Sequence, residues 1–339
     1  MSALPAADSA VVLLAITNGG PRKHALLSAF ERRHENWSLD VARKAFGEAT
    51  QPPVDGFELR FVDAVQGEAA KNRAKLEAFA GDVLDDFGLD DSQRDAFGAC
   101  AAAARPGNRR VLGCLLANLR AMRIAAPIPN AIVVEDNVRP AAGAGARCAA
   151  ALAGGECADL SYFGHLAHDD TLAAISALPR DGRGFVATPA PRDAEGAGAP
   201  GEPRRNHELW GTFAYRVSPR LYAAVVAHVT ADFPASLFRM RRRDCDVVAV
   251  DKLIQRVARK VGLTVRALAP PALFRMPPAL PSKIHRKWDA PFLNSTTDQL
   301  RLYGSSWAAV WLTPEERGLA EAREAALDAA APRGQVDIA

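Results

Sequence analysis

The fold is decided around one stretch, AIVVEDN at residues 131–137. Its first four residues are apolar, and its last three are two carboxylates and an amide. A short apolar run of this kind is typical of a strand that is buried on both faces. Ligands of open α/β sheets bind beyond the carboxyl ends of such strands, so the acidic end of this stretch is a candidate site.

The chain on both sides of this stretch alternates between helix and strand patterns. Apolar residues at three- and four-residue spacing predict a helix over 111–125, and a second apolar stripe over 250–261 predicts another. Strands are predicted at 11–16, 57–62, 159–163, 184–187, 210–217 and 263–268. The alternation predicts an α/β fold with a Rossmann-like, mostly parallel central sheet flanked by helices.

We expect one domain over residues 1–312. Residues 189–206 are rich in Pro, Gly and charge and predict a surface loop. Residues 313–339 are charged and Ala-rich and predict a helical tail that packs on the outside.

The composition is that of a globular protein, with 49% hydrophobic and 24% charged residues. The formal net charge of +3 is small, so no nucleic-acid partner is expected. Basic residues cluster at 239–243 and 283–287, which are either solvated faces or contacts for an anionic ligand. The five cysteines are widely spaced and indicate neither a zinc site nor a disulfide framework. Free thiols fit a reducing compartment, and the first apolar run is too short for a signal peptide or a membrane span, so we expect a cytoplasmic enzyme without a transmembrane segment.

The acidic end of the central stretch has the chemistry of a cation site. Carboxylate and amide oxygens, here from Glu135, Asp136 and Asn137, are the ligands that Mg²⁺ and Mn²⁺ prefer. Such an ion neutralises charge that develops on a diphosphate leaving group. A short acidic run after a strand also serves simply to cap a turn or the next helix, and taken alone this interpretation is the commoner one.

The helix GCLLANLRA (113–121), the strand after it and its EDN end resemble glycosyltransferase family 25. That family includes lipopolysaccharide-type galactosyltransferases and collagen β-galactosyltransferases. Its members carry a Gly-Cys-x-x-Ser-His helix followed by an apolar strand that ends in Glu-Asp-Asp. Further segments resemble family landmarks in the family's order, namely FVDAVQG at 61–67, GTFAYRVS at 211–218 and AVDKLI at 249–254.

The resemblance implies a GT-A-type fold and the transfer of a hexose, galactose or glucose, from a UDP-sugar to a hydroxyl of a glycan or protein. It also implies inversion at the anomeric carbon, a metal-bound diphosphate leaving group and a carboxylate base. Two positions depart from the family pattern: Asn137 replaces the third acidic residue, and Ala117-Asn118 replaces the Ser-His pair. A catalytically impaired, nucleotide- or glycan-binding protein is therefore the alternative.

The resemblance places Asp251 on the acceptor side of the site, where a carboxylate acts as general base. Asp246 is a weaker candidate for the same role. Capping or dipole complementation at a helix N-terminus explains Asp251 equally well. His285, among basic residues, is a candidate late metal ligand or simply a surface residue.

Donor contacts are predicted for the loop that follows the first strand. Thr17, Asn18 and Arg22 lie in this loop, where backbone N–H groups and a guanidinium meet phosphate. An ordinary strand-to-helix turn is the alternative. Val134 and Glu135, at the end of the central strand, are the other predicted donor contacts.

Overall fold

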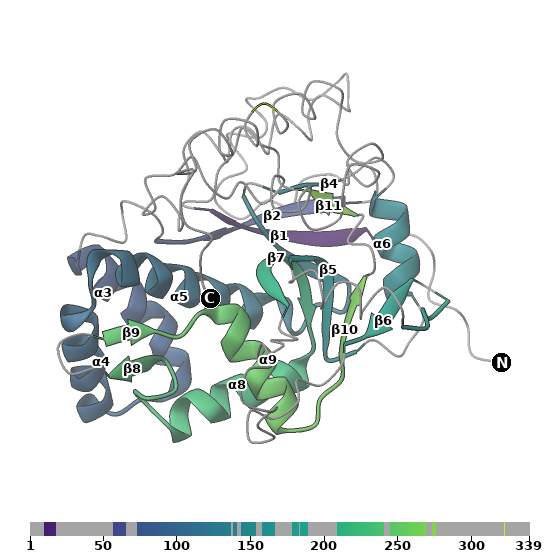
Figure 1. Cartoon of the computed structure of the whole chain (residues 1–339). Coiled ribbons are helices and arrows are strands. Elements are labelled where there is room, and N and C mark those ends of the chain that lie inside the picture. Colours follow the sequence, from purple (N-terminus) through teal and green to yellow (C-terminus); the bar gives the residue numbers. More distant parts are fainter. Residues whose placement is uncertain are drawn as a thin grey trace, which may run out of the picture.

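A computed structural model gives the structure of the chain (Figure 1). It describes residues 10–17, 57–65, 73–136, 138–140, 144–153, 158–166, 178–182, 184–188, 209–240, 245–268, 273–275 and 322. The predicted loop at 189–206 lies outside these residues, as does the predicted tail at 313–339 except for residue 322.

A seven-stranded sheet forms the centre of the protein, in the order β2-β1-β3-β7-β5-β10-β6 (Figure 1). Its strands are β1 (Val11–Thr17), β2 (Phe57–Asp63), β3 (Ala131–Glu135), β5 (Leu160–Leu166), β6 (Phe185–Ala187), β7 (Trp210–Val217) and β10 (Val265–Leu268).

The sheet is mixed and mostly parallel. β2 and β3 both run parallel to β1, and β10 runs parallel to β5. β7 lies antiparallel between β3 and β5, so β5 points the same way as β1. Only β7 and the edge strand β6 run in the opposite direction. The prediction of an α/β fold with a mostly parallel sheet is therefore confirmed.

Helices cover both faces of the sheet (Figure 1). One face, which we call the α5 face, packs against α3 (Arg73–Leu84), α4 (Asp91–Ala103), α5 (Pro106–Ala125), α8 (Pro219–Ala231) and α9 (Val250–Lys260). The opposite face, the α6 face, packs against α6 (Ala144–Leu152). A one-turn 3-10 helix, η2 (Asp85–Phe87), links α3 to α4.

Two small ribbons complete the described fold. β8 (Phe238–Met240) pairs antiparallel with β9 (Cys245–Val247) beside α4 and α5. β4 (Arg139–Pro140) pairs antiparallel with β11 (Phe274–Arg275), which places Phe274 in the core of the α6 face.

The alternation of side chains along β1 divides the core into two layers. Val12, Leu14 and Ile16 pack into the α5 face, whereas Val11 and Leu13 pack into the α6 face. A strand that buries both faces must be apolar throughout, which is why β1 and β3 read as continuous apolar runs in the sequence.

The observed ends of the elements follow local chemistry. Pro106 stands in the first turn of α5, so this helix begins earlier than the predicted residue 111. Ser218 caps α8 by accepting a hydrogen bond from the Leu221 amide at 3.1 Å. The predicted strand at 263–268 starts only at Val265, because the Leu263 amide still donates to the Ala258 carbonyl of α9 at 2.7 Å. Within the described part of the chain, no helix has the length and apolarity needed to cross a membrane.

Candidate functional site at the carboxyl edge of the sheet

The chain order reverses at β1, which creates the kind of position where open α/β sheets bind ligands. β1 has β2 on one side and β3 on the other, and all three strands point the same way. Their carboxyl ends meet at one edge, with Thr17 level with Asp63 and Ile16 level with Glu135. In such sheets the ligand crevice opens outside this edge, at the switch point.

Two predicted site residues meet across this switch point. The Thr17 hydroxyl donates a hydrogen bond to Oδ2 of Asp136 at 3.0 Å, and both side chains are buried. Asp136 is only 1% exposed, and a carboxylate so far from water needs hydrogen bonds to remain favourable there. The contact therefore fixes the turn after β3 against the end of β1.

Glu135 and Asp136 approach the site from different sides. Glu135 follows Val133 on the α5 face, as the alternation along β3 requires. Asp136 instead contacts Thr17, which follows Ala15 on the α6 face. The prediction that Glu135, Asp136 and Asn137 hold one ion stays a prediction, since Asn137 lies outside the described residues.

On the α5 face, a buried polar chain lies behind Glu135. The Tyr215 hydroxyl of β7 donates to Oδ1 of Asn118 at 2.8 Å. The Asn118 amide group donates in turn to the Cys114 carbonyl at 2.9 Å and lies 3.5 Å from the Cys114 sulfur. Both Asn118 and Tyr215 are fully buried. Asn118, which stands where the family pattern has a histidine, is thus fixed at both ends of its amide.

The charges of two predicted site carboxylates both act on Cys114. Burial raises the pKa of the Cys114 thiol well above its usual range, and the charges of Glu135 and Asp251 raise it further. Burial likewise raises the pKa of Tyr215 well above its usual range, with Glu135 again contributing. Glu135 of β3 and Asp251 of α9 therefore both act on the same part of α5.

The middle of α9 is anchored to the chain just before β7. Gln255 accepts a hydrogen bond from the Leu209 amide at 3.2 Å and donates to the Leu209 carbonyl at 2.6 Å. This pair ties α9 to the residue just before β7. In the first turn of α9, Oδ1 of Asp251 accepts from the Lys252 amide at 2.8 Å. That contact fits a role at the helix N-terminus, and it leaves the predicted role as base open as well.

Asp246 lies at the other end of α5. Its Oδ1 accepts from the Asn108 amide at 3.2 Å, and the same amide donates to the Cys245 carbonyl at 2.8 Å. Asn108 is in the first turn of α5, and at 1.5 Å per residue it precedes Cys114 by roughly 9 Å along the helix. Asp246 is therefore held beside the first turn of α5, whereas the charge of Asp251 acts on Cys114.

The remaining predicted residues divide into two groups. The side chain of Val134 packs into the core of the α6 face, so any contact with a donor would involve its backbone. Asn18, Arg22, Asn137 and His285 lie outside the described residues. Within the described ranges, no three His, Cys, Asp or Glu side chains gather closely enough to hold a metal ion.

Sequence reasoning missed one functional candidate, His165. It lies on β5, beyond the end of the strand predicted at 159–163, and it is only 1% exposed. Burial lowers the pKa of its imidazole to about 3, so the ring is neutral at physiological pH. The signal in the sequence is a single histidine at the carboxyl side of an apolar strand, which by itself does not reveal burial.

Comparison of the chain with protein-family models, curated proteins and solved structures finds no match. The likeness to glycosyltransferase family 25 therefore rests on the residues quoted above. What the structure adds is their arrangement, a mostly parallel α/β sheet with buried polar and acidic side chains at its carboxyl edge.

Proposed function

We propose that this protein is a glycosyltransferase with a GT-A-type fold, which transfers a hexose, galactose or glucose, from a UDP-sugar to a hydroxyl of a glycan or protein. The observation that carries the proposal is the buried hydrogen bond between Thr17 and Asp136. It joins the carboxyl ends of β1 and β3 at the switch point, where a nucleotide would be expected to bind.

The meeting of separate family-like segments supports the same function. Cys114 and Asn118 come from the helix segment, Glu135 from the strand end, Tyr215 from the β7 segment and Asp251 from the start of α9. These residues are linked by hydrogen bonds or by electrostatic interaction around Cys114. These residues come from separate parts of the sequence, and their interaction on one face of the sheet supports the proposal.

In the proposed reaction, the acceptor hydroxyl attacks the anomeric carbon of the hexose from the side opposite the diphosphate. A new carbon–oxygen bond forms, the bond from the anomeric carbon to the diphosphate oxygen breaks, and UDP leaves. The acceptor proton passes to the Asp251 carboxylate, a step that contributes about 10²–10⁴-fold in typical enzymes. Asp251 is preferred to Asp246 because Asp251 interacts with Cys114 together with Glu135.

A divalent cation would assist departure of the diphosphate. Glu135 and Asp136, with Asn137 and His285 as further predicted ligands, would hold Mn²⁺ or Mg²⁺, which neutralises charge on a departing diphosphate. The hydrogen bond from Thr17 fits this role, because it orients a buried carboxylate at the strand end. Without such a hydrogen bond, the Asp136 carboxylate would be costly to bury.

The second candidate function is binding of a nucleotide or glycan without turnover. It is favoured by Asn118, because an amide fixed between Tyr215 and Cys114 neither accepts nor delivers a proton during a reaction. The replacement of a third acidic residue by Asn137 also favours binding without turnover.

The two functions are separated by assaying the full chain with Mn²⁺ and a panel of nucleotide sugars that includes UDP-galactose and UDP-glucose. We expect metal-dependent release of UDP, measured as slow donor hydrolysis when no acceptor is supplied, and its loss on addition of EDTA. Tight UDP binding without any UDP release would establish the second candidate. Failure to bind any nucleotide or nucleotide sugar would exclude the first function and the nucleotide-binding form of the second.

A further inference from the structure

His165 is a buried polar side chain that has no part in the reaction proposed above. It lies near the carboxyl end of β5 and is 1% exposed. Among the residues that the structure describes, none forms a hydrogen bond with Nδ1 or Nε2 of its imidazole. A buried polar group without a hydrogen bond costs about 1–3 kcal/mol, so a purely structural role would favour an apolar side chain here.

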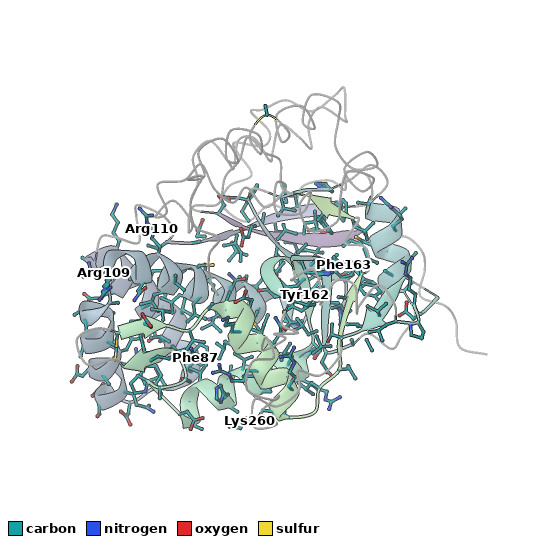
Figure 2. All side chains as sticks on the ribbon, viewed as in Figure 1. Phe87, Arg109, Arg110, Tyr162, Phe163 and Lys260 are labelled. Carbon is teal, nitrogen blue, oxygen red and sulfur yellow. The ribbon has the colours of Figure 1, made fainter. Side chains whose placement is uncertain are left out.

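The imidazole lies on the α5 face, the face that also carries Glu135. The His165 ring meets the Tyr162 ring edge-on, with centroids 6.4 Å apart. Tyr162 is directly opposite Tyr215, and Tyr215 is directly opposite Val133, so these residues form one row across β5, β7 and β3. Figure 2 shows Tyr162 on β5 in the middle of the sheet, next to Phe163, which packs into the α6 face.

Glu135 and His165 both lie beyond this row toward the carboxyl edge. Glu135 is two residues past Val133, and β5 runs in the same direction as β3. A bulge between Tyr162 and Gly164 shifts the register of β5, which allows His165 to share a face with Tyr162. β3 and β5 are separated by β7 alone, so at about 4.8 Å per strand spacing the two backbones lie roughly 10 Å apart.

The chemistry of a neutral imidazole restricts what it can recognise. One ring nitrogen donates a hydrogen bond and the other accepts one, which matches a hydroxyl group. A diphosphate offers only acceptors and would favour a protonated ring, whereas burial keeps the pKa of His165 low, at about 3. The β5 side of the site therefore suits an uncharged, hydroxyl-bearing part of a ligand.

We propose that His165 is a specificity-determining residue that hydrogen-bonds a hydroxyl of the transferred hexose. The proposal rests on the proposed function and deepens it: the nucleotide binds near Thr17 and Asp136, and the hexose extends past Glu135 toward β5. It assigns the sugar to a named side chain, and it separates sugar recognition from nucleotide recognition.

Isothermal titration of the full chain with UDP, UDP-galactose and UDP-glucose, each in the presence of Mn²⁺, tests this assignment. We expect at least one UDP-hexose to bind more tightly than UDP. In His165→Leu the ratio of the UDP-hexose affinity to the UDP affinity should fall by about tenfold, which is the effect of one hydrogen bond. The affinity for UDP itself should stay within about twofold of the wild-type value. His228→Leu is the matched control, because His228 lies on α8, outside the proposed site. Its Nδ1 is 3.4 Å from Oδ2 of Asp232.

A conservative variant distinguishes hydrogen bonding from packing. His165→Gln retains one donor and one acceptor and should recover most of the gain from the hexose, whereas His165→Leu should not. If His165→Leu does not fold, His165→Phe, which also lacks both ring nitrogens, replaces it in the titration, and a folded His165→Phe protein that keeps the whole gain in affinity from the hexose would overturn the assignment.

The outcomes distinguish failure of the His165 assignment from failure of the proposed function. If UDP binds and the gain from the hexose is the same in His165→Leu as in wild type, or if wild type shows no gain, the assignment of His165 is overturned while the nucleotide site stands. If wild type binds neither UDP nor a UDP-hexose, the proposed function and the assignment of His165 are both overturned.

Discussion

The two ends of β5 carry buried polar clusters of opposite character. At the amino end, Asp159 just precedes the strand, and at the carboxyl end lies His165. Both side chains are largely removed from water, yet the first makes several hydrogen bonds and the second makes none to the described residues. The same strand thus contains a closed polar cluster and an open one.

The cluster around Asp159 is closed. Oδ1 of Asp159 accepts from the Ser218 hydroxyl at 2.9 Å. Oδ2 accepts from both the amide and the hydroxyl of Thr264, each at 3.1 Å. Arg216 nearby donates to the Pro129 carbonyl at 3.0 Å and the Ala158 carbonyl at 3.1 Å. This network joins the ends of β5, β7 and β10, and both carboxylate oxygens of Asp159 accept hydrogen bonds within it, so we assign it a structural role.

The cluster at the carboxyl edge differs because the His165 ring makes no hydrogen bond to the described residues. The chain from Tyr215 through Asn118 to Cys114 is satisfied, but His165 is not, and the charges of Glu135 and Asp251 act on a buried thiol. Natural proteins keep such costly arrangements where a ligand completes them. The comparison predicts that changes at the Asp159 end alter stability and that changes at the carboxyl edge alter binding and catalysis.

The largest effect is expected from the acidic residues of the open cluster. Glu135→Gln and Asp136→Asn should each lower Mn²⁺-dependent UDP release by at least roughly 100-fold, because about 3 kcal/mol of charge stabilisation is removed. The thermal midpoint should change little, since both variants keep the shape of the side chain. Glu58→Gln on β2, where Glu58 pairs with Arg60 at 2.7 Å, is the matched control and should remain active. Full activity in both site variants would show that the site is misplaced.

The reverse pattern is expected at the closed cluster. Asp159→Ala removes the acceptor of three hydrogen bonds and should lower the free energy of unfolding by about 3 kcal/mol, measured by urea denaturation. The activity per folded molecule should be unchanged. Asp85→Ala breaks the exposed pair with Arg94 and should cost about 1 kcal/mol or less. A stable but inactive Asp159→Ala protein would invalidate the contrast between the two ends.

The buried imidazole should make stability depend on pH. His165 has a pKa of about 3 in the folded protein and an ordinary value of 6.5 when unfolded, so between these values the unfolded chain binds more protons. Stability is therefore lost as pH falls below about 6.5, by about 2 kcal/mol between pH 7 and pH 5. The His165→Leu variant should not show this loss of stability, because it has no imidazole to protonate. Equal pH dependence of urea denaturation in wild type and variant would show that His165 is not buried as a neutral ring.

The smallest effect is expected at the switch point. Thr17→Val removes the hydrogen bond to Asp136 at nearly constant shape and should lower the free energy of unfolding by about 1 kcal/mol. Urea denaturation of Thr17→Val and wild type would measure this loss. If Thr17→Val is as stable as wild type, the hydroxyl of Thr17 does not hold Asp136 in place.

Much of the fold could be predicted because its signals are local. The strand Trp210–Val217 is predicted at the residues where it occurs, since its alternating pattern can be read within a few positions. The short ribbon of β8 and β9 was not predicted. Its strands are three residues long, too short for a periodic pattern to show.

The sequence by itself determined the α/β alternation and the acidic end of β3. Both patterns are local, and the apolar run with its following carboxylates can be recognised within seven residues. Only the tertiary structure decided which distant residues join that end. Thr17 meets Asp136 across 119 positions, and the charges of Glu135 and Asp251, from β3 and α9, both act on Cys114 of α5. The burial of His165 likewise depends on packing of the α5 face and on a bulge in β5, and neither leaves a local trace in the chain.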